Sequence, residues 1–335
     1  MRPSRRSTAT TVAGLVAITI ASSTCNPFAL APIENRIDFP ARLDAFALLA
    51  EPPGQLRPAA GVVEFSLATP LFTDHAHKQR LMRLPVGTTL QRRGDGLPTF
   101  PDGTVLAKTF FYPRDARVDA EAPGNRQLVE TRLLVKAEGG WSAATYRWTE
   151  AQDAALLLER GAVVPITWVD ASGTPRSLRY EVPSRDDCGA CHREGSRLVP
   201  LGPALRNLDH VVRRDSASVR QLRYLEARGV LSSGTAGATR AMPAWDDPEA
   251  PLEARARAYL EVNCAHCHRE GGWASATGLR LAWELPHRAT RIDERRAEIE
   301  RRLTSRNRGE RMPRLGTTIP HDEGIALLRA FLRER

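Results

Sequence analysis

The chain has 335 residues, of which 42% are hydrophobic and 26% are charged. It is long enough for two domains with separate hydrophobic cores, and its composition excludes a disordered or fibrous protein. The formal net charge is +9, but the excess is spread along the chain and no compact basic run with interleaved aromatic residues occurs. This pattern argues against a nucleic-acid partner.

Residues 1–24 have the pattern of a secretory signal peptide. An arginine-bearing start is followed by the apolar run TTVAGLVAITIA and then by small residues, so we expect an exported protein. No later segment has the roughly 18 consecutive apolar residues of a membrane-spanning helix. Cys25 follows the leader and leaves two outcomes open. Either its thiol carries a lipid anchor, or the chain is simply cleaved near Ser23. The second outcome is kept because the residues before Cys25 match the lipoprotein pattern poorly.

Four of the five cysteines form two tight pairs, each followed at once by a histidine. The pairs and their histidines are Cys188, Cys191 and His192, then Cys264, Cys267 and His268. C-x-x-C-H is the attachment signature of haem c. Two thiols on one short turn form thioether bonds to the haem vinyl groups, and the next histidine binds the iron. The sequence therefore predicts two covalently attached haem c groups.

Two other uses of paired cysteines fit less well. A structural zinc site built from two C-x-x-C pairs has about 15 to 20 residues between the pairs, whereas 72 residues separate Cys191 from Cys264. A thioredoxin-like redox pair would leave the histidine after each pair unexplained.

From residue 36 to residue 183 the sequence predicts β structure. Five stretches alternate apolar and polar residues or are rich in β-branched and aromatic ones, and Gly, Pro and Asp turns separate them. They are residues 62–67, 104–111, 128–137, 141–148 and 163–169. An antiparallel sandwich or barrel fits this pattern best. We expect its aromatic side chains to pack in the core or on a sheet face. They are Trp141, Tyr146, Trp148 and Trp168.

Helical patterns follow the β-rich module. A helix is predicted over residues 216–229, another over 251–263 that ends at Cys264, and an amphipathic helix over 322–334. The fold class is therefore α+β. We divide the chain into a leader (1–24), a β-rich module (36–183), a first haem-binding segment (184–250) and a C-terminal domain with the second haem (251–335).

The C-terminal domain resembles a small His/Met cytochrome c domain. It has a helix that ends in C-x-x-C-H, a Met-Pro pair 44 residues after His268, and a C-terminal amphipathic helix. The resemblance implies that Met312 is the distal ligand of the second haem. It also implies that the first and last helices cross, with Tyr259 and Phe331 in contact.

A longer resemblance covers most of the chain. The order of LFTDHAHKQRLMRLPVGT, FPDGTVLAKTFF, ETRLLV and YRW, then CGACH, then EARARAYLEVNCAHCH is similar to a group of exported bacterial dihaem c-type cytochromes. These are largely uncharacterised and often encoded beside parallel β-helix proteins. The resemblance implies electron carriage between redox partner proteins in the periplasm.

The sixth ligand of the first haem is left open by the sequence. Met242 precedes a proline and lies 50 residues after His192, much as Met312 follows His268. The histidines His210, His75 and His77 are rivals, and an open iron is the third possibility.

An open iron would favour a different function. The leading hypothesis is an electron carrier, and the alternative is a haem oxidoreductase or peroxidase whose five-coordinate first haem faces the β-rich module. In a third possibility this module binds carbohydrate or protein and the haems are its electron outlet. Enzymatic activity stays open, and no carboxylate pair or Ser/His/Asp arrangement points to a catalytic residue.

The remaining histidines are expected at the surface. They are His266, His287 and His321. The charged run over residues 288–306 predicts a solvated helix with opposite charges three or four residues apart, here Arg291 with Glu294 and Glu298 with Arg302.

Overall fold

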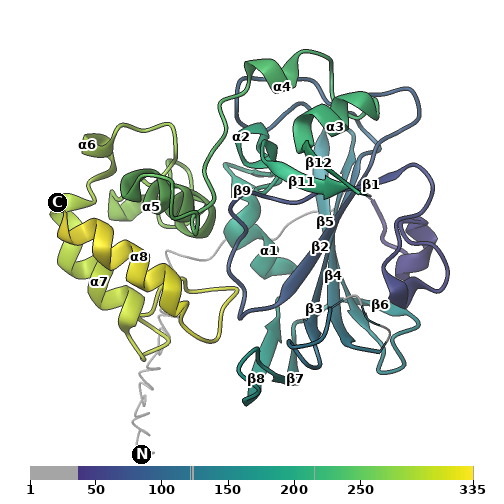
Figure 1. Ribbon diagram of the computed structural model, residues 1–335, viewed down its shortest axis with the longest axis horizontal. Helices are drawn as coiled ribbons and strands as arrows, with labels where there is room; N and C mark the ends of the chain where they lie inside the picture. Colours follow the sequence, from purple (N-terminus) through teal and green to yellow (C-terminus); the bar gives the residue numbers. More distant parts are fainter. Residues whose placement is uncertain (1–36, 121, 123, 215, 335) are drawn as a thin grey trace, which may run out of the picture. The chain divides into compact units, whose positions relative to one another are not determined.

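The computed structural model describes residues 37–334 except 121, 123 and 215. The predicted leader and Cys25 lie outside the described residues. Helices and antiparallel strands are mixed along the chain (Figure 1), so the α+β class is confirmed. In the described part of the chain, no helix combines the length and the hydropathy that crossing a membrane requires.

The β-rich module is built on one antiparallel sheet in which each strand pairs with the next along the chain. Its strands are β1 (Val62–Glu64), β2 (His77–Arg83), β3 (Val105–Pro113), β4 (Arg126–Ala137), β5 (Gly140–Trp148) and β6 (Ala155–Leu158). β7 (Ala162–Val169) and β8 (Pro175–Val182) form a separate hairpin. The six-stranded sheet is open, with β1 and β6 at its edges, so it does not close into the barrel that was one of the expected forms.

Both faces of this sheet are covered, because successive residues of a strand point to opposite faces. Leu81 joins a cluster with Leu43 and Leu48 from the segment before β1, which includes the short helices η1 (Leu43–Phe46) and η2 (Pro53–Gln55). The next residue, Met82, joins a cluster on the other face with Leu205. Trp141, Tyr146 and Trp148 are buried as predicted, and Trp168 packs against Tyr112 with ring centres 5.3 Å apart.

The segment after the sheet supplies the second cover. Its elements are α1 (Arg185–His192), β9 (Arg193–Glu194), β10 (Arg197–Leu198), α2 (Leu205–Leu208), β11 (Val211–Arg214), β12 (Ala217–Arg220), α3 (Gln221–Ala227) and α4 (Thr235–Ala238). The helix predicted over 216–229 is wrong in its first turn. Residues 217–220 form β12, because pairing with β11, with Val219 opposite Val212, outweighs their helical periodicity.

The C-terminal segment is helical. Its elements are α5 (Leu252–Leu260), the π-helical turn η3 (Glu261–Ala265), η4 (Ser275–Thr277), α6 (His287–Thr290), η5 (Asp293–Arg295), α7 (Arg296–Thr304) and α8 (Asp322–Arg333). Tyr259 of α5 and Phe331 of α8 share one buried cluster, as expected. The two predicted ion pairs of the charged run are present: Arg291 with Glu294 at 2.7 Å, and Glu298 with Arg302.

α8 lies very close to α5. A Cβ atom built at Gly324 would stand 2.3 Å from the Tyr259 hydroxyl oxygen and 2.4 Å from Cζ of the same ring. Only a residue without a side chain allows this approach.

The loop between β1 and β2 joins the sheet to the C-terminal helices. The backbone N–H of Phe72 donates to Asn263 Oδ1 at 2.9 Å, and the buried Asp74 carboxylate accepts from the N–H and the hydroxyl of Thr318, both at 2.8 Å. These bonds connect residues that are about 190 and 244 positions apart.

The same loop corrects the prediction for His321. The ring of His321 stacks on Phe72 with ring centres 4.0 Å apart, and its Nδ1 lies 2.9 Å from the Tyr259 hydroxyl. Its side chain is only 12% exposed, and burial lowers the pKa of His321 to about 4. His287 is also mostly covered and pairs with Asp293, so neither histidine is a free surface residue.

Candidate functional site

The first cysteine pair lies on α1. Ser184 and Asp187 form a capping box at its N-terminus, in which the Asp187 carboxylate accepts from the Ser184 N–H at 2.9 Å. Residues three and four positions apart share a helix face, so Cys188, Cys191 and His192 point the same way. All three line one large cavity.

The His192 ring is held in one orientation. After α1 the chain turns back through the β9–β10 hairpin, and Val199 then lies beside His192. The backbone N–H of Val199 donates to the His192 carbonyl at 2.7 Å, and His192 Nδ1 lies 2.9 Å from the Val199 carbonyl oxygen. Because that oxygen can only accept, Nδ1 carries the proton and Nε2 has a free lone pair. Burial lowers the pKa of His192 to about 4, so the imidazole is neutral at pH 7.

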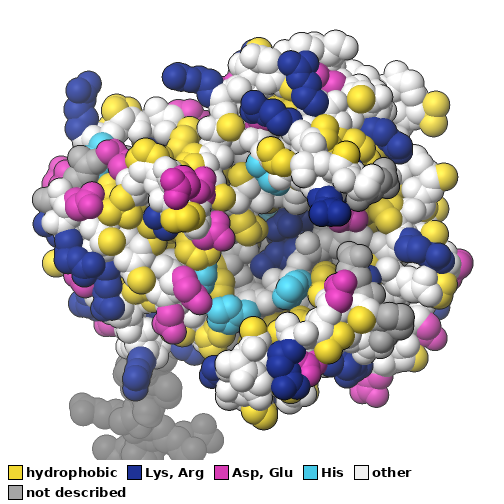
Figure 2. Space-filling model, viewed as in Figure 1, with side chains coloured by type: hydrophobic (Ala, Val, Ile, Leu, Met, Phe, Trp, Pro, Cys, Tyr) yellow, Lys and Arg dark blue, Asp and Glu magenta, His cyan; other side chains and the backbone are white. Residues whose placement is uncertain are grey.

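The cavity has a volume of about 990 Å³, at the upper end of the range for small-molecule sites. Apolar side chains make up much of its wall, including Phe65, Leu67, Leu106 and Leu134. The space-filling view shows a hollow in this face of the molecule with Lys or Arg side chains at its floor and His side chains nearby (Figure 2).

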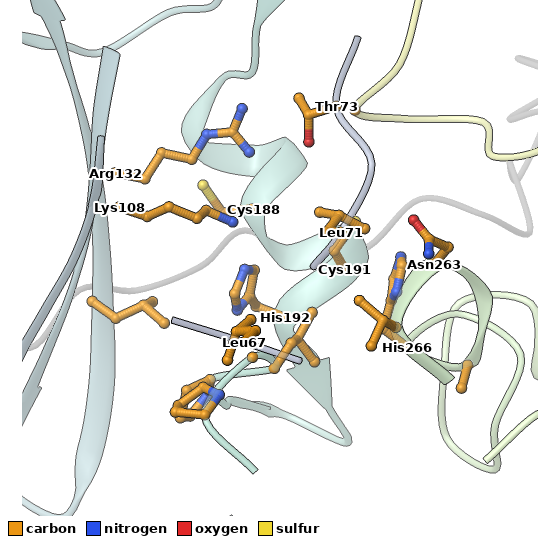
Figure 3. A pocket seen from close by; sticks show the side chains of 18 of the residues that line it. Leu67, Leu71, Thr73, Lys108, Arg132, Cys188, Cys191, His192, Asn263 and His266 are labelled. Atoms are coloured by element: carbon orange, nitrogen blue, oxygen red, sulfur yellow. The ribbon is translucent and has the colours of Figure 1, made fainter. Parts of the chain in front are cut away.

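Three cationic side chains of the sheet face this cavity. Arg80 lies directly opposite Lys108, and Lys108 directly opposite Arg132, on β2, β3 and β4. Figure 3 shows Lys108 and Arg132 extending from the sheet toward α1, the helix that carries Cys188. We call Arg80, Lys108 and Arg132 the cationic row. Burial lowers the pKa of Arg80 to about 10, and burial together with Arg132 and Arg80 lowers that of Lys108 to about 7.

One acidic residue neutralises part of the row. Glu130 is fully buried and accepts two hydrogen bonds from Arg132, at 2.5 and 2.9 Å, and one from the Tyr180 hydroxyl at 2.6 Å. Burial acts to lower the pKa of Arg132, but the Glu130 carboxylate outweighs burial and holds that pKa above its usual value.

The second cysteine pair lies at the end of α5. Cys264 is in the π-helical turn η3, a feature frequent at functional sites, and Cys267 and His268 follow it. His268 Nδ1 lies 3.4 Å from the Thr277 hydroxyl. Burial and the neighbouring His266 lower the pKa of His268 to about 4, so this imidazole is also neutral at pH 7.

The structure brings the two cysteine motifs together, which sequence reasoning missed. The ligand atoms of Cys191, His266 and Cys267 all lie within 4.8 Å of one another, and Cys267 Sγ lies 3.7 Å from the Ala190 carbonyl oxygen. His266 lines the cavity beside α1 (Figure 3), and its side chain is partly covered there, whereas a position facing solvent was predicted. No local pattern reveals this contact, because it joins segments about 75 positions apart.

The four described thiols differ in acidity, and the hydrogen bond with Cys191 holds the pKa of Cys267 well above its usual value. Burial raises the pKa of Cys188 to about 11 and that of Cys264 to about 12. A hydrogen bond from the Cys267 thiol and a second from His266 lower the pKa of Cys191. Cys191 is therefore the thiol that most easily becomes a thiolate, the form that binds metals and attacks other groups.

The candidate sixth ligands fall in different places. Met242 is 2% exposed and lines the same cavity as His192. Of its rivals, His210 lies 2.9 Å from the Ser66 hydroxyl, His77 is exposed on β2 beside Phe111, and His75 packs against Phe72. None of the three is among the residues that line the cavity.

The predicted ligands of the second haem do not share this cavity. Neither His268 nor Met312 lines it, and Met312 lines a separate pocket of about 10 Å³. The cavity is bordered by residues next to each of them, namely Ala265, His266, Pro313 and Leu315.

Sequence reasoning also missed the cationic row. A signal for it is present, because Lys78 and Lys108 are two of only three lysines in the chain, and Lys108 and Arg132 stand within the predicted strands over 104–111 and 128–137. Comparison of this chain with family models, with curated proteins and with solved structures finds no match.

Proposed function

We propose that the protein is a periplasmic dihaem c-type cytochrome that carries single electrons between redox partner proteins. Bound haem c supplies an iron couple whose potential depends on its axial ligands. The observation that carries the proposal is the arrangement on α1, where Cys188, Cys191 and a neutral His192 point into a large, mostly apolar cavity.

The residues of the first motif fit a covalently held haem. Cys188 and Cys191 supply the two thiols, and His192 supplies Nε2 as the proximal ligand. The Val199 carbonyl oxygen fixes the tautomer and the orientation of that ring, as outer-shell partners of ligating histidines do. Leu67, Leu106 and Leu134 keep water from the wall of the site.

The second motif offers the same donor set. Cys264 and Cys267 supply thiols, His268 is half-buried and its lowered pKa keeps it neutral at pH 7, and Met312 supplies a thioether. We propose that residues 251–335 have a cytochrome c-like fold, supported by the packing of α5 on α8, whose Tyr259 and Phe331 belong to one buried cluster. The neighbouring sulfur atoms of Cys191 and Cys267 support a role for both sites in one electron path within the chain.

Met242 favours a carrier over an enzyme. It is the one predicted sixth ligand among the described residues that shares the cavity with His192, and two protein ligands leave no position for a substrate. In the proposed wild-type protein neither haem binds carbon monoxide. Met242→Ala is expected to make one haem reactive toward it, whereas the enzyme alternative predicts that wild type already reacts.

The test is a pyridine haemochrome assay combined with intact mass on protein exported from a host with haem c maturation. Wild type is expected to carry two haems, and Cys188→Ala/Cys191→Ala and Cys264→Ala/Cys267→Ala one each. Wild-type protein with no covalent haem would overturn the proposal. The same mass spectrum identifies the mature N-terminus and shows whether Cys25 carries a lipid.

The three-residue group Cys191, His266 and Cys267 supports a second candidate function, a metal site with two thiolates and one imidazole. His266→Ala separates the two candidates. It removes a ligand of the metal site but leaves both C-x-x-C-H motifs intact. Unchanged haem content with no bound zinc in wild type supports the cytochrome, and stoichiometric zinc that the variant loses supports the metal site.

A further inference from the structure

The cationic row is an unusual arrangement inside a protein. Arg80, Lys108 and Arg132 stand side by side on three neighbouring strands, in direct register. Like charges placed directly opposite each other destabilise a sheet, and a buried charge without a partner costs more still. The row therefore persists at a cost that the rest of the site must offset.

The protein compensates only part of this charge. The Glu130 carboxylate is committed to Arg132 and Tyr180. The ring of Phe110 faces Arg132 at 4.4 Å and Lys108 at 5.0 Å, which gives each a cation–π contact. Arg80 is 7% exposed, and its Nη2 is buried with no hydrogen-bond partner among the described residues.

Five of the six carboxylates that line the cavity are engaged elsewhere. Asp187 caps α1, Glu261 and Glu284 pair with Arg206, and Glu181 and Glu194 pair with Arg308 and Arg269. Glu130 is the carboxylate that pairs with the row, and Arg80 and Lys108 can take an acidic partner from outside the chain.

We propose that the cationic row is an anion-binding site, which holds a carboxylate or a small oxyanion inside the cavity. Guanidinium groups bind such anions through paired N–H donors, and the lysine adds a point charge. The bound anion can come from two sources. It is a free anion from solution, or it is a carboxylate of a haem held by Cys188 and Cys191. The site rests on the geometry of the sheet, and only the second source rests on the proposed function.

The experiment measures sulfate binding by titration calorimetry at constant ionic strength, with chloride as the background anion. The full chain is used in two forms, expressed with and without haem c maturation, and covalent haem is counted in each. The variants are Lys108→Gln and Arg80→Gln. The matched control is Lys136→Gln, on β4 of the same sheet, whose side chain does not line the cavity. Removing one like charge relieves repulsion, so Lys108→Gln is expected to fold.

If the anion is free, sulfate binds the haem-loaded protein. Either row variant then raises the dissociation constant for sulfate about tenfold to a hundredfold. Lys136→Gln leaves this constant unchanged. If the anion belongs to the haem, sulfate binds only the haem-free chain, and Lys108→Gln shifts the reduction potential of one haem in the loaded protein. Sulfate binding by neither form, or binding that the row variants do not weaken, would overturn the proposal. If the chain expressed with haem c maturation carries no covalent haem but still binds sulfate through the row, the cytochrome is refuted but the anion site is not.

Discussion

Glu130→Gln is the most informative test of the charge arrangement in the sheet. The substitution keeps the volume of a fully buried side chain and so creates no cavity. It removes the one negative charge next to Arg132. It also places an amide group where Arg132 donates at 2.5 and 2.9 Å and the Tyr180 hydroxyl at 2.6 Å. A glutamine cannot accept all three bonds.

The expected loss of folding free energy is about 3–5 kcal/mol, the cost of removing one partner of a buried ion pair. The loss should lie in the upper part of this range, because Lys108 also loses the attraction of the Glu130 carboxylate. Removing both partners, as in Glu130→Gln/Arg132→Met, is expected to recover most of the loss, since an apolar pair needs no counter-charge.

Urea unfolding followed by tryptophan fluorescence gives both quantities. The control is Glu298→Gln on α7, whose carboxylate pairs with Arg301 and Arg302 in solvent, where the unfolding midpoint should hardly move. The reasoning fails if Glu130→Gln unfolds at the wild-type urea concentration. It also fails if the double variant is less stable than the single one.

Three further predictions concern the C-terminal helices. Gly324→Ala should lower the free energy of unfolding by about 1–3 kcal/mol, because the added methyl group overpacks against Tyr259. Gly237→Ala in α4, where the nearest atom to the added methyl group is the tip of an arginine at 3.8 Å, should not destabilise the fold. Equal unfolding midpoints for the two variants would contradict this prediction. Asp74→Asn should lower the free energy of unfolding by about 1–3 kcal/mol, because the hydrogen bonds that the carboxylate accepts from Thr318 become weaker. Limited proteolysis should then cut the variant near Thr318 faster than it cuts wild type. His321 has its pKa lowered to about 4 in the folded chain against about 6.5 when unfolded. The unfolded state therefore binds the proton first, and stability falls as the pH drops from about 6.5 to 4. His321→Gln should flatten this part of a pH series of urea midpoints, and an unchanged slope would refute the assignment.

Local patterns in the sequence predict most of the sheet but not its whole content. β3, β4, β5 and β7 follow the predicted strands closely because their residues are β-branched, aromatic or alternating. β2 was not predicted, because Lys78 and Arg80 stand at positions where a two-sided buried strand normally carries apolar residues. The same departure from the pattern marks the candidate anion site.

The candidate cofactor residues illustrate a second limit. The two C-x-x-C-H motifs identify thiols and imidazoles by type and spacing, and the helix caps and turns around them are local. The closeness of Cys191 to Cys267 goes with contacts between the two motif segments, in which Cys267 lies beside the Ala190 carbonyl and Arg269 pairs with Glu194. Such contacts depend on tertiary packing between segments about 75 positions apart, which periodicity does not record.

The closeness of Cys191 and Cys267 also matters before any cofactor is attached. A disulfide needs its two sulfur atoms at about 2.05 Å, and the folded chain already holds these two within 4.8 Å of each other. The favoured thiolate at Cys191 is the reactive form in thiol–disulfide exchange. A disulfide between Cys191 and Cys267 would consume one thiol of each motif, so a reductant is needed when the free-thiol chain is handled in the laboratory.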